Sequence, residues 1–387
     1  MKVLFLAPQP FFEERGTPIA VDLLLRVLSE RGEQVDLVTY HLGKDVDYEN
    51  LKINRIISLP FIRVVPPGFS MQKIICDFFL FWKVIFMVTR EEYHIVHAVE
   101  ESVLAAYILN KLWGIEYIYD MDSSLPKQLI DKFPSLKPIA SFLYFVERLA
   151  IRNAVTVVPV NDALVEEIGK SGLDNVIVLH DVPLVDNSWG EMIESIREEL
   201  GISGLLVMYV GNLESYQGID LLLESFTSIQ EYTESINLAI IGGRDKDIQK
   251  YERISRALGI SHLVEFIGPR PIKYLGKYLS EADILVSPRI SGDNTPMKIY
   301  SYLGSGKPIV ATKLRTHTQV LDDQVALLVA PAPKSFAKGV LTLVEDAALR
   351  KELGRRGKKL IEEKYNFENY QISVNLIYDS LAPLQDH

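Results

Sequence analysis

The feature that most constrains this chain is an alternation of short apolar runs with longer amphipathic stretches, which occurs in both halves. In the first half, residues 3–7 and 34–39 are strand-like, and residues 19–31 between them have helical periodicity. In the second half, the strand-like run 205–210 precedes the helical stretch 218–230. Apolar strands that alternate with helices are typical of parallel α/β sheets. Further strand-like runs are expected at residues 95–98, 116–119, 155–159, 237–241, 264–267, 284–287, 308–311 and 326–329.

The length of the chain fits two such domains, because 387 residues exceed what one ordinary core accommodates. The turn-rich segment 181–190 separates the halves and is the expected hinge. The sequence therefore predicts an N-terminal Rossmann-like domain over residues 1–185 and a C-terminal one over residues 190–366. The last stretch, 345–381, is mostly helical and is interrupted near residues 365–367.

Charge and cysteine content exclude several classes of protein. The net charge is -10, and an acidic surface repels the phosphate backbone of nucleic acids. Cys76 is the single cysteine, so neither an intramolecular disulfide nor a cysteine-based zinc site can form. We therefore expect a protein of a reducing compartment that does not bind nucleic acid.

Two apolar segments raise the question of membrane contact. The N-terminal apolar run stops at Pro8 and two acids follow, so a buried first strand explains it better than a signal peptide. Residues 74–88 are apolar but include Asp77 and Lys83, and they are fewer than the ~20 residues that a membrane span needs. We expect a helix packed on the core, with an interfacial helix as the alternative.

Residues 287–298 form the most informative motif, because they follow a buried strand and open a helix. Thr295 suits the N-cap position and Pro296 the first helical position. Lys298 in the first helical turn is unfavourable for the helix dipole unless an anion lies in front of it. The motif therefore predicts a phosphate site, whereas the alternative is an ordinary loop with a solvated lysine.

A second glycine-bearing turn lies at residues 210–218. Gly211 allows a ligand to approach the backbone closely, and Gly218 eases entry into the next helix. The turn is not GxGxxG, so a nicotinamide-dependent oxidoreductase is not supported. Gly304 and Gly306 precede a lysine without P-loop spacing, and we expect them to end a helix.

Three loops of the first half follow predicted strands and carry polar groups. They comprise residues 15–18, 97–101 and 119–124. The carboxyl ends of parallel strands form the crevice where open α/β folds bind ligands. Each loop taken alone is also explained by a helix cap or a solvated turn. Together they predict a second ligand-binding region.

In their order along the chain these segments resemble family 4 of the retaining glycosyltransferases, which have the GT-B fold. Residues 210–213 resemble that family's VGRL turn, and residues 296–310 resemble its PxKxxEYxAxGKPVV helix. Residues 238–243, 266–268 and 282–288 are similar to its strand motifs. The resemblance is strongest over residues 205–331 and looser over the first ~180 residues.

The resemblance implies two Rossmann-like domains that face each other across a cleft. The N-terminal domain would bind the acceptor, and the C-terminal domain would bind a nucleotide-diphosphate sugar as co-substrate, without a metal or another cofactor. A C-terminal helix over residues 367–387 would pack back on the N-terminal domain.

The resemblance also implies the roles of single residues. Glu100, Asp122, Asp293 and Lys298 are the expected catalytic residues. Asp293 stands at the first acid of the family's E-x7-E motif, which contacts the donor sugar. Lys298 also belongs to the expected donor-binding set, which further comprises Gly16, Gly211, Asn212, Gln217, Arg244, Arg270, Arg289, Thr295, Pro296, Met297 and Ser301.

The chain departs from the family pattern at several of these positions. Ser301 replaces the second acid of E-x7-E, and Asn212 and Gln217 replace an arginine and a lysine of the VGRL turn. Each lost charge-assisted hydrogen bond costs about 1.5–3 kcal/mol. Asp122 stands where many members have histidine. With Ser301 at its second acidic position, the E-x7-E motif is degenerate relative to the family.

The expected function is the retaining transfer of a sugar from a nucleotide donor to a glycan or lipid-linked acceptor, in surface polysaccharide or glycolipid synthesis. The alternative is a catalytically inactive GT-B scaffold or binding subunit, motivated by the same departures. We expect a cytoplasmic protein. Peripheral contact with the inner face of a membrane, through the helix 78–88 and the upstream Phe61 and Phe69, is left open.

Overall fold

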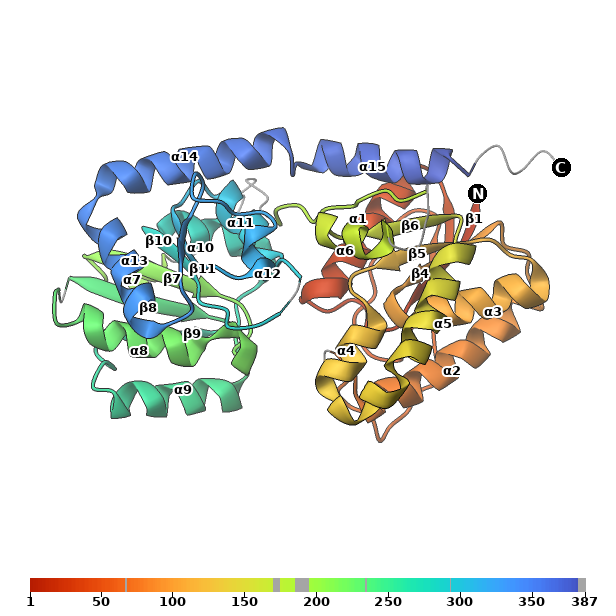
Figure 1. The fold of residues 1–387 in the computed structure, drawn as a ribbon, viewed down its shortest axis with the longest axis horizontal. Helices are drawn as coiled ribbons and strands as arrows, with labels where there is room; N and C mark the ends of the chain where they lie inside the picture. The colour runs from red at the N-terminus through yellow and green to blue at the C-terminus, as the bar shows by residue number, and fades with distance from the viewer. Residues whose placement is uncertain (67, 170–174, 185–194, 234, 293, 382–387) are drawn as a thin grey trace. The chain divides into compact units, whose positions relative to one another are not determined.

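The computed structural model divides the chain into two α/β units, which are described one at a time. It describes residues 1–66, 68–169, 175–184, 195–233, 235–292 and 294–381. The first unit comprises Met1–His180 and the chain from Tyr370 onward, and the second comprises Asp181–Asn369. The predicted α/β class is confirmed in both units, because each contains a six-stranded parallel sheet with helices around it (Figure 1).

The first sheet has the strand order β3-β2-β1-β4-β5-β6. Its strands are β1 (Lys2–Ala7), β2 (Gln34–Thr39), β3 (Leu51–Arg55), β4 (Ile95–Val99), β5 (Tyr117–Met121) and β6 (Thr156–Pro159). The central strands β1 and β4 are buried along nearly their whole length, as expected for a parallel sheet covered on both faces. The sequence did not predict β3, an edge strand in which no residue is fully buried.

The helices of the first unit form two groups. They are α1 (Gly16–Glu30), α2 (Met71–Val88), α3 (Val103–Trp113), α4 (Leu125–Lys132), α5 (Ala140–Asn153) and α6 (Asp162–Gly169), with the short 3-10 helices η1 (Glu100–Ser102) and η2 (Pro134–Ile139). Helices α2 to α5 lie together on one side of the sheet (Figure 1). On the other side, α15 (Phe367–Asp379) reaches α1, since Arg31 bonds to Asn375 and Asp379.

The second sheet has the strand order β12-β11-β10-β7-β8-β9. Its strands are β7 (Leu205–Val210), β8 (Ile236–Ile241), β9 (Val264–Gly268), β10 (Ile284–Ser287), β11 (Ile309–Thr312) and β12 (Leu327–Val329). Its helices are α7 (Ile196–Glu199), α8 (Ile219–Ile229), α9 (Asp245–Ala257), α10 (Leu275–Glu281), α11 (Lys298–Gly304), α12 (Arg315–Thr318), α13 (Pro333–Glu345) and α14 (Ala347–Glu363), with 3-10 helices η3 (Ser215–Gln217) and η4 (Ile272–Tyr274). The predicted interruption near residues 365–367 is confirmed, because α14 ends at Glu363 and α15 begins at Phe367.

Both sheets reverse their strand order at one point. The reversal lies between β1 and β4 in the first unit and between β7 and β10 in the second. At such a point the loops at the carboxyl ends of the two strands diverge and leave room for a ligand. The predicted motifs at residues 210–218 and 287–298 follow β7 and β10, so the second sheet brings both to its reversal point.

The predicted start of the helix after β10 was wrong. Helix α11 begins at Lys298, with Met297 as the cap, rather than at Pro296 with Thr295 as the cap. The Ile299 amide donates to the Pro296 carbonyl (2.9 Å) and the Tyr300 amide to the Met297 carbonyl (3.1 Å), so a tight i to i+3 turn precedes the helix. Thr295 is buried, and its hydroxyl has no hydrogen-bond partner within the described chain.

Candidate functional site

Two loops meet at the reversal point of the second sheet. The loop after β7 and the loop after β10 are joined by a hydrogen bond from the Ile290 amide to the Tyr216 carbonyl (3.0 Å). Gly218 has φ +73°, and a Cβ there would lie 2.1 Å from the Pro288 carbonyl oxygen. Only glycine allows this approach, so Gly218 is required for the loop after β7 to pack against the loop after β10.

Lys298 lies at the centre of this junction. Its Nζ donates to Gln217 Oε1 (3.1 Å) and stands 3.9 Å from the centroid of the Tyr209 ring. A Cβ on Gly211 would lie 3.2 Å from the same Nζ, so the glycine keeps the space beside the ammonium open. Burial, and secondarily the charge of Arg289, hold the pKa of Lys298 well below its ordinary value. No carboxylate of the described residues forms an ion pair with Lys298.

Arg289 holds the second positive charge. Its Nη1 donates to the Asn294 carbonyl and to Thr316 Oγ1, both at 2.7 Å. The guanidinium lies 4.9 Å from the centroid of the Tyr216 ring. These contacts fix the side chain in the loop after β10. We call Gly211, Gln217, Arg289 and Lys298 the basic site.

A buried histidine holds the start of the loop after β10 in place. His317 of α12 bonds through Nε2 to Ser287 Oγ (2.8 Å) and through Nδ1 to the Thr312 carbonyl (2.8 Å). Burial lowers the pKa of His317 to about 4, so the ring is neutral at pH 7. Nδ1 then carries the proton and Nε2 accepts from the Ser287 hydroxyl. The ring fixes the end of β10, from which the loop with Arg289 departs.

The basic site suits a ligand with two or more negative charges. The charge of Arg289 adds to the burial that lowers the pKa of Lys298, and an anion placed between the two cations would stabilise both. A diphosphate offers several oxygens to such a pair, and Gly211 leaves room for close approach. Within the part of the chain that the structure describes, no three His, Cys, Asp or Glu side chains are grouped as a metal site.

Several predicted donor-binding residues lie around the basic site. Thr295, Pro296 and Met297 form the turn that leads into Lys298. Asn212 is exposed; its Oδ1 accepts from the Glu214 amide (3.2 Å) and its Nδ2 donates to the Tyr216 hydroxyl (3.4 Å). Asp293, the predicted contact for the donor sugar, lies outside the described residues.

Three other predicted donor-binding residues have partners elsewhere in the second unit. Arg244 is paired with Glu214 (2.6 Å) and Asp247 (2.9 Å). Arg270 donates to both oxygens of Glu199 (2.7 and 2.9 Å). Ser301 in α11 is fully buried, and its hydroxyl accepts from the Leu184 amide (3.1 Å). Their roles in donor binding stay predictions.

The sequence analysis missed four residues that contact or support the basic site. Tyr209 had a usable signal, because alternation along β7 places it on the same side as Gly211. Tyr216 stands beside Gln217 in the predicted turn but was not singled out. Thr316 and His317 come from α12, more than twenty residues after Arg289, and only the parallel pairing of β10 with β11 brings them to the site.

The first unit carries an acidic group at the carboxyl ends of its strands. Lys73 of α2 forms ion pairs with Glu101 (2.6 Å) and Glu100 (3.4 Å), and Asp77 accepts a hydrogen bond from the Tyr40 hydroxyl. We call Lys73, Asp77, Glu100 and Glu101 the acidic cluster. Burial raises the pKa of Glu101 to about 8 and that of Asp77 to about 6. The charge of Glu100 raises both values further, whereas Lys73 opposes the shift.

The predicted residues of the first unit are placed as follows. Glu100 follows β4 and has φ +50°, an uncommon conformation for a non-glycine residue. Asp122 follows β5, is partly buried and contributes to raising the pKa of the buried Tyr119. Gly16 begins α1 with open space where a Cβ would stand. Glu100 and Asp122 thus lie at the carboxyl ends of β4 and β5, whereas Gly16 lies at the start of α1, after the loop that follows β1.

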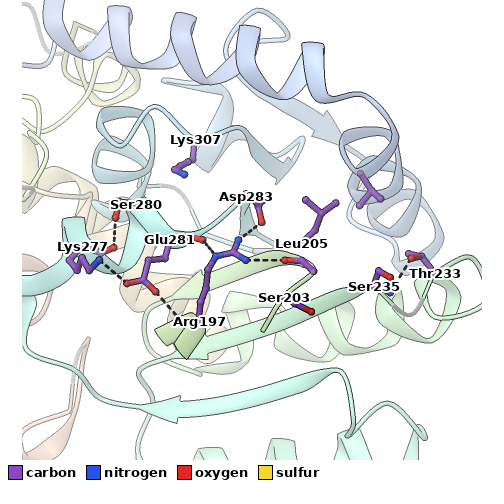
Figure 2. Close-up of a pocket in the computed structure, with 12 residues that line it drawn as sticks. Arg197, Ser203, Leu205, Thr233, Ser235, Lys277, Ser280, Glu281, Asp283 and Lys307 are labelled. Carbon is purple, nitrogen blue, oxygen red and sulfur yellow. Dashed lines mark hydrogen bonds and ion pairs between the residues drawn. The ribbon is translucent and has the colours of Figure 1, made fainter. Parts of the chain in front are cut away.

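A pocket of about 850 Å³ lies at the opposite end of the second sheet (Figure 2). It is lined by Gly204 and Leu205 at the start of β7 and by Asp283 just before β10. Its charges satisfy one another, because Arg197 bonds to Asp283, to the Glu281 carbonyl (2.8 Å) and to the Gly204 carbonyl (2.9 Å). The amino ends of the strands are not where α/β folds bind substrates, so size alone does not make this pocket the site.

Two family models match the chain and together cover both units. The model of the glycosyl transferase 4-like domain matches residues 15–180, and that of glycosyl transferases group 1 matches residues 192–360. With the two sheets and the basic site, these matches define a glycosyltransferase of the GT-B fold. The chain belongs to glycosyltransferase family 4.

Individual proteins show the same similarity. The chain is 24% identical over 355 residues to D-inositol 3-phosphate glycosyltransferase of Corynebacterium aurimucosum, with 85% of this chain and 82% of that protein covered. The fold is similar to Anabaena HepE in complex with UDP (TM-score 0.75, 14% identity, 98% of this chain and 100% of that one). It is also similar to WaaG, a glycosyltransferase involved in lipopolysaccharide biosynthesis (TM-score 0.73, 14% identity, 97% and 99% covered).

Proposed function

We propose that the chain transfers a sugar from a nucleotide-diphosphate donor to a glycan or lipid-linked acceptor, with retention of anomeric configuration. The observation that carries this proposal is Lys298, a buried lysine beside Arg289 without a carboxylate partner among the described residues. A buried cation of this kind is unfavourable until an anion binds. The diphosphate of a nucleotide sugar supplies that anion.

In the proposed reaction, negative charge develops on the leaving diphosphate as the bond to the sugar breaks. Lys298 and Arg289 stabilise this charge, and their contacts with Gln217, Thr316 and the Asn294 carbonyl hold them in place beforehand. Preorganised cations in a water-poor site reduce the barrier more than the same cations in water would. That no metal takes part stays a prediction.

The first unit would bind the acceptor in this proposal. Glu100 and Asp122 lie at the carboxyl ends of β4 and β5, where their carboxylates can accept hydrogen bonds from sugar hydroxyls. Surface polysaccharide or glycolipid synthesis is the setting we propose, supported by the similarity to WaaG, which is involved in lipopolysaccharide biosynthesis. A cytoplasmic location is proposed from the single cysteine.

An inactive binding or scaffold subunit is the second candidate. The observation in its favour is that positions where the family carries donor contacts are engaged internally here. Gln217 accepts from Lys298, and the hydroxyl of Ser301 accepts from the Leu184 amide with no exposed surface. Such a subunit would bind nucleotides weakly or not at all.

A thermal-shift panel with UDP, GDP, ADP and their common sugar conjugates separates the two candidates. Specific binding stabilises the folded state by about 2.7 kcal/mol at a hundredfold excess over Kd. We expect one nucleotide class to raise Tm, and Lys298→Ala to abolish that rise. The matched control is Lys338→Ala, an exposed lysine on α13.

The outcomes have distinct meanings. A shift that Lys298→Ala abolishes and Lys338→Ala preserves supports the transferase and identifies the nucleotide. A flat panel with the wild-type chain favours the scaffold. A shift that survives in Lys298→Ala contradicts the assignment of the diphosphate to the basic site.

A further inference from the structure

We propose that one face of the first unit docks on the surface of an anionic lipid bilayer. The face consists of exposed apolar side chains on the loop after β3 and on helices α2 and α5, with η2 between α4 and α5. We call it the aromatic face; its members are Phe61, Val64, Met71, Ile74, Phe78, Trp82, Phe86, Phe133, Ile139, Phe142 and Phe145. The proposal concerns the first unit alone and does not rest on the donor or on catalysis.

Helix α2 is apolar on two opposite sides. One stripe, Cys76, Leu80, Val84 and Met87, is buried in the core of the first unit. The other stripe recurs every three or four residues from Met71 to Phe86 and is exposed, with Phe78 at 59% and Trp82 at 55%. A surface helix of a water-soluble domain normally has polar residues on its outer side. The exposed stripe therefore indicates a partner that is itself apolar.

The aromatic face continues from α2 to α5. The ring of Phe69, just before α2, packs edge-on against Phe133 at the end of α4, with centroids 5.6 Å apart. Lys132 Nζ donates to the Phe69 carbonyl (2.5 Å), which ties the two segments together. Phe142 and Phe145 on α5 are 62% and 54% exposed. Figure 1 shows α2, α4 and α5 on the same side of the first sheet.

The charge around this face is opposite to that of the whole chain. Residues 125–153 contain five Lys or Arg and two Asp or Glu, whereas the chain carries -10. One of the two acids, Glu147, is buried and accepts from Ser124 Oγ (2.9 Å) and the Leu125 amide (2.8 Å). Just after α2, the guanidinium of Arg90 lies 3.9 Å from the centroid of the Phe86 ring. Basic groups at the rim of an apolar surface attract anionic headgroups while the aromatic rings enter the interface.

This charge pattern favours a bilayer over a second copy of the chain. A symmetric dimer would bring the basic segment 125–153 of one copy against the same segment of the other. Like charges would then oppose the contact. An anionic bilayer satisfies the aromatic rings and the basic rim at once. No helix of the described residues is long and apolar enough to cross a membrane.

Flotation of the purified full chain with lipid vesicles tests the proposal. We expect the chain to float with vesicles of phosphatidylcholine and phosphatidylglycerol and to remain unbound with phosphatidylcholine alone. Phe78→Ser/Trp82→Ser should reduce the bound fraction at least about tenfold, because two aromatic side chains no longer leave water. Arg148→Glu/Lys137→Glu should also reduce the bound fraction, most strongly at low salt, and the difference from the wild type should shrink as salt is raised.

Matched controls keep the result interpretable. Tyr232→Ser removes an aromatic side chain that is 73% exposed in the second unit, and it should leave vesicle binding unchanged. Circular dichroism and the nucleotide-induced rise in Tm, measured on each variant, show that folding and the basic site are intact. Failure of vesicle binding with a normal nucleotide response would therefore overturn the membrane proposal without touching the proposed function.

Three results would overturn the proposal. These are no flotation with anionic vesicles, equal flotation with neutral and anionic vesicles, or undiminished flotation of Phe78→Ser/Trp82→Ser. Self-association that the double substitution abolishes and that vesicles do not compete for would assign the aromatic face to a second copy instead.

Discussion

In the first unit, Glu100 and Glu101 after β4 meet Lys73 and Asp77 of α2, so three carboxylates surround one lysine, whereas in the second unit Lys298 and Arg289 bring two cations together and Lys298 has no carboxylate partner among the described residues. Both sheets have the same relative strand order and both reverse it at the corresponding point. The fold therefore fixes where a ligand can bind but not the charge of that ligand. The residues around each reversal point decide the charge, and this difference underlies our proposal that the first unit binds hydroxyl groups and the second phosphates.

The two units also respond to pH in opposite directions. In the acidic cluster, burial raises the pKa of carboxyl groups, so the folded first unit retains protons that the unfolded chain releases. At the basic site, burial lowers the pKa of Lys298 and His317, so the folded second unit binds fewer protons than the unfolded chain. Alkaline conditions therefore destabilise the first unit, and acidic conditions destabilise the second.

The largest expected effect comes from removing the cation of the basic site. Lys298→Ala should lower kcat/KM by about 10²–10³, since one preorganised group that stabilises developing negative charge contributes that much. The measurement is initial-rate sugar transfer with the donor found in the thermal-shift panel. Lys338→Ala should retain wild-type rates. Wild-type turnover in Lys298→Ala would break the proposed division between a phosphate-binding and a hydroxyl-binding unit.

The next largest effect is the acid sensitivity of the second unit. The pKa of His317 is about 4 in the folded chain, whereas its ordinary value is 6.5. Its contribution to the free energy of unfolding is therefore complete above pH 6.5 and is lost as the pH falls to 4. The loss amounts to about 3 kcal/mol. Protection factors of the β10 and β11 amides, measured by hydrogen exchange with mass spectrometry and corrected for the intrinsic exchange rate at each pH, should fall over this range. His317→Gln should make the protection of these amides less dependent on pH. An unchanged pH dependence in that variant would show that other groups cause it.

A smaller effect of opposite sign is expected in the first unit. The pKa of Glu101 is raised to about 8 from 4.5, so its stabilising contribution is present below pH 4.5 and is lost as the pH rises to 8. Glu101→Gln should therefore increase the protection of β4 and β5 amides at pH 8 relative to the wild type. The net gain is about 1–2 kcal/mol, less than the pKa shift alone corresponds to, because the variant also loses the ion pair with Lys73. The exposed Glu92→Gln serves as the control. A larger gain in protection from Glu101→Gln at pH 5 than at pH 8 would contradict the assignment.

The smallest effect is proton uptake when a nucleotide binds. A bound diphosphate should raise the pKa of Lys298 from its depressed value, so binding takes up as much as one proton. Nucleotide affinity should then fall by at most about tenfold per pH unit above the pKa of the free chain. Calorimetry in buffers of different ionisation enthalpy measures the uptake. Lys298→Gln, which cannot be protonated, should remove it; persistent uptake would point to another group.

The sequence by itself determined the class of the fold and the location of the basic site. Apolar periodicity predicted the strands that became β1, β2, β7 and β10, because buried parallel strands need continuous apolar residues. Gly211 and Lys298 could be singled out because turn chemistry and an unfavourably placed charge are local properties. The edge strand β3 escaped notice because its residues are only partly buried.

Only the tertiary structure decided which distant residues complete each site. Helix α11 begins at Lys298 rather than Pro296, because the turn bonds of Ile299 and Tyr300 displace the start that capping preferences predicted. Thr316 and His317 reach Arg289 through the pairing of β10 with β11, and Lys73 of α2 reaches Glu101 through packing on the sheet. Burial shifts the pKa values of Lys298, His317 and Glu101, and burial is a property of the packed chain rather than of its local sequence.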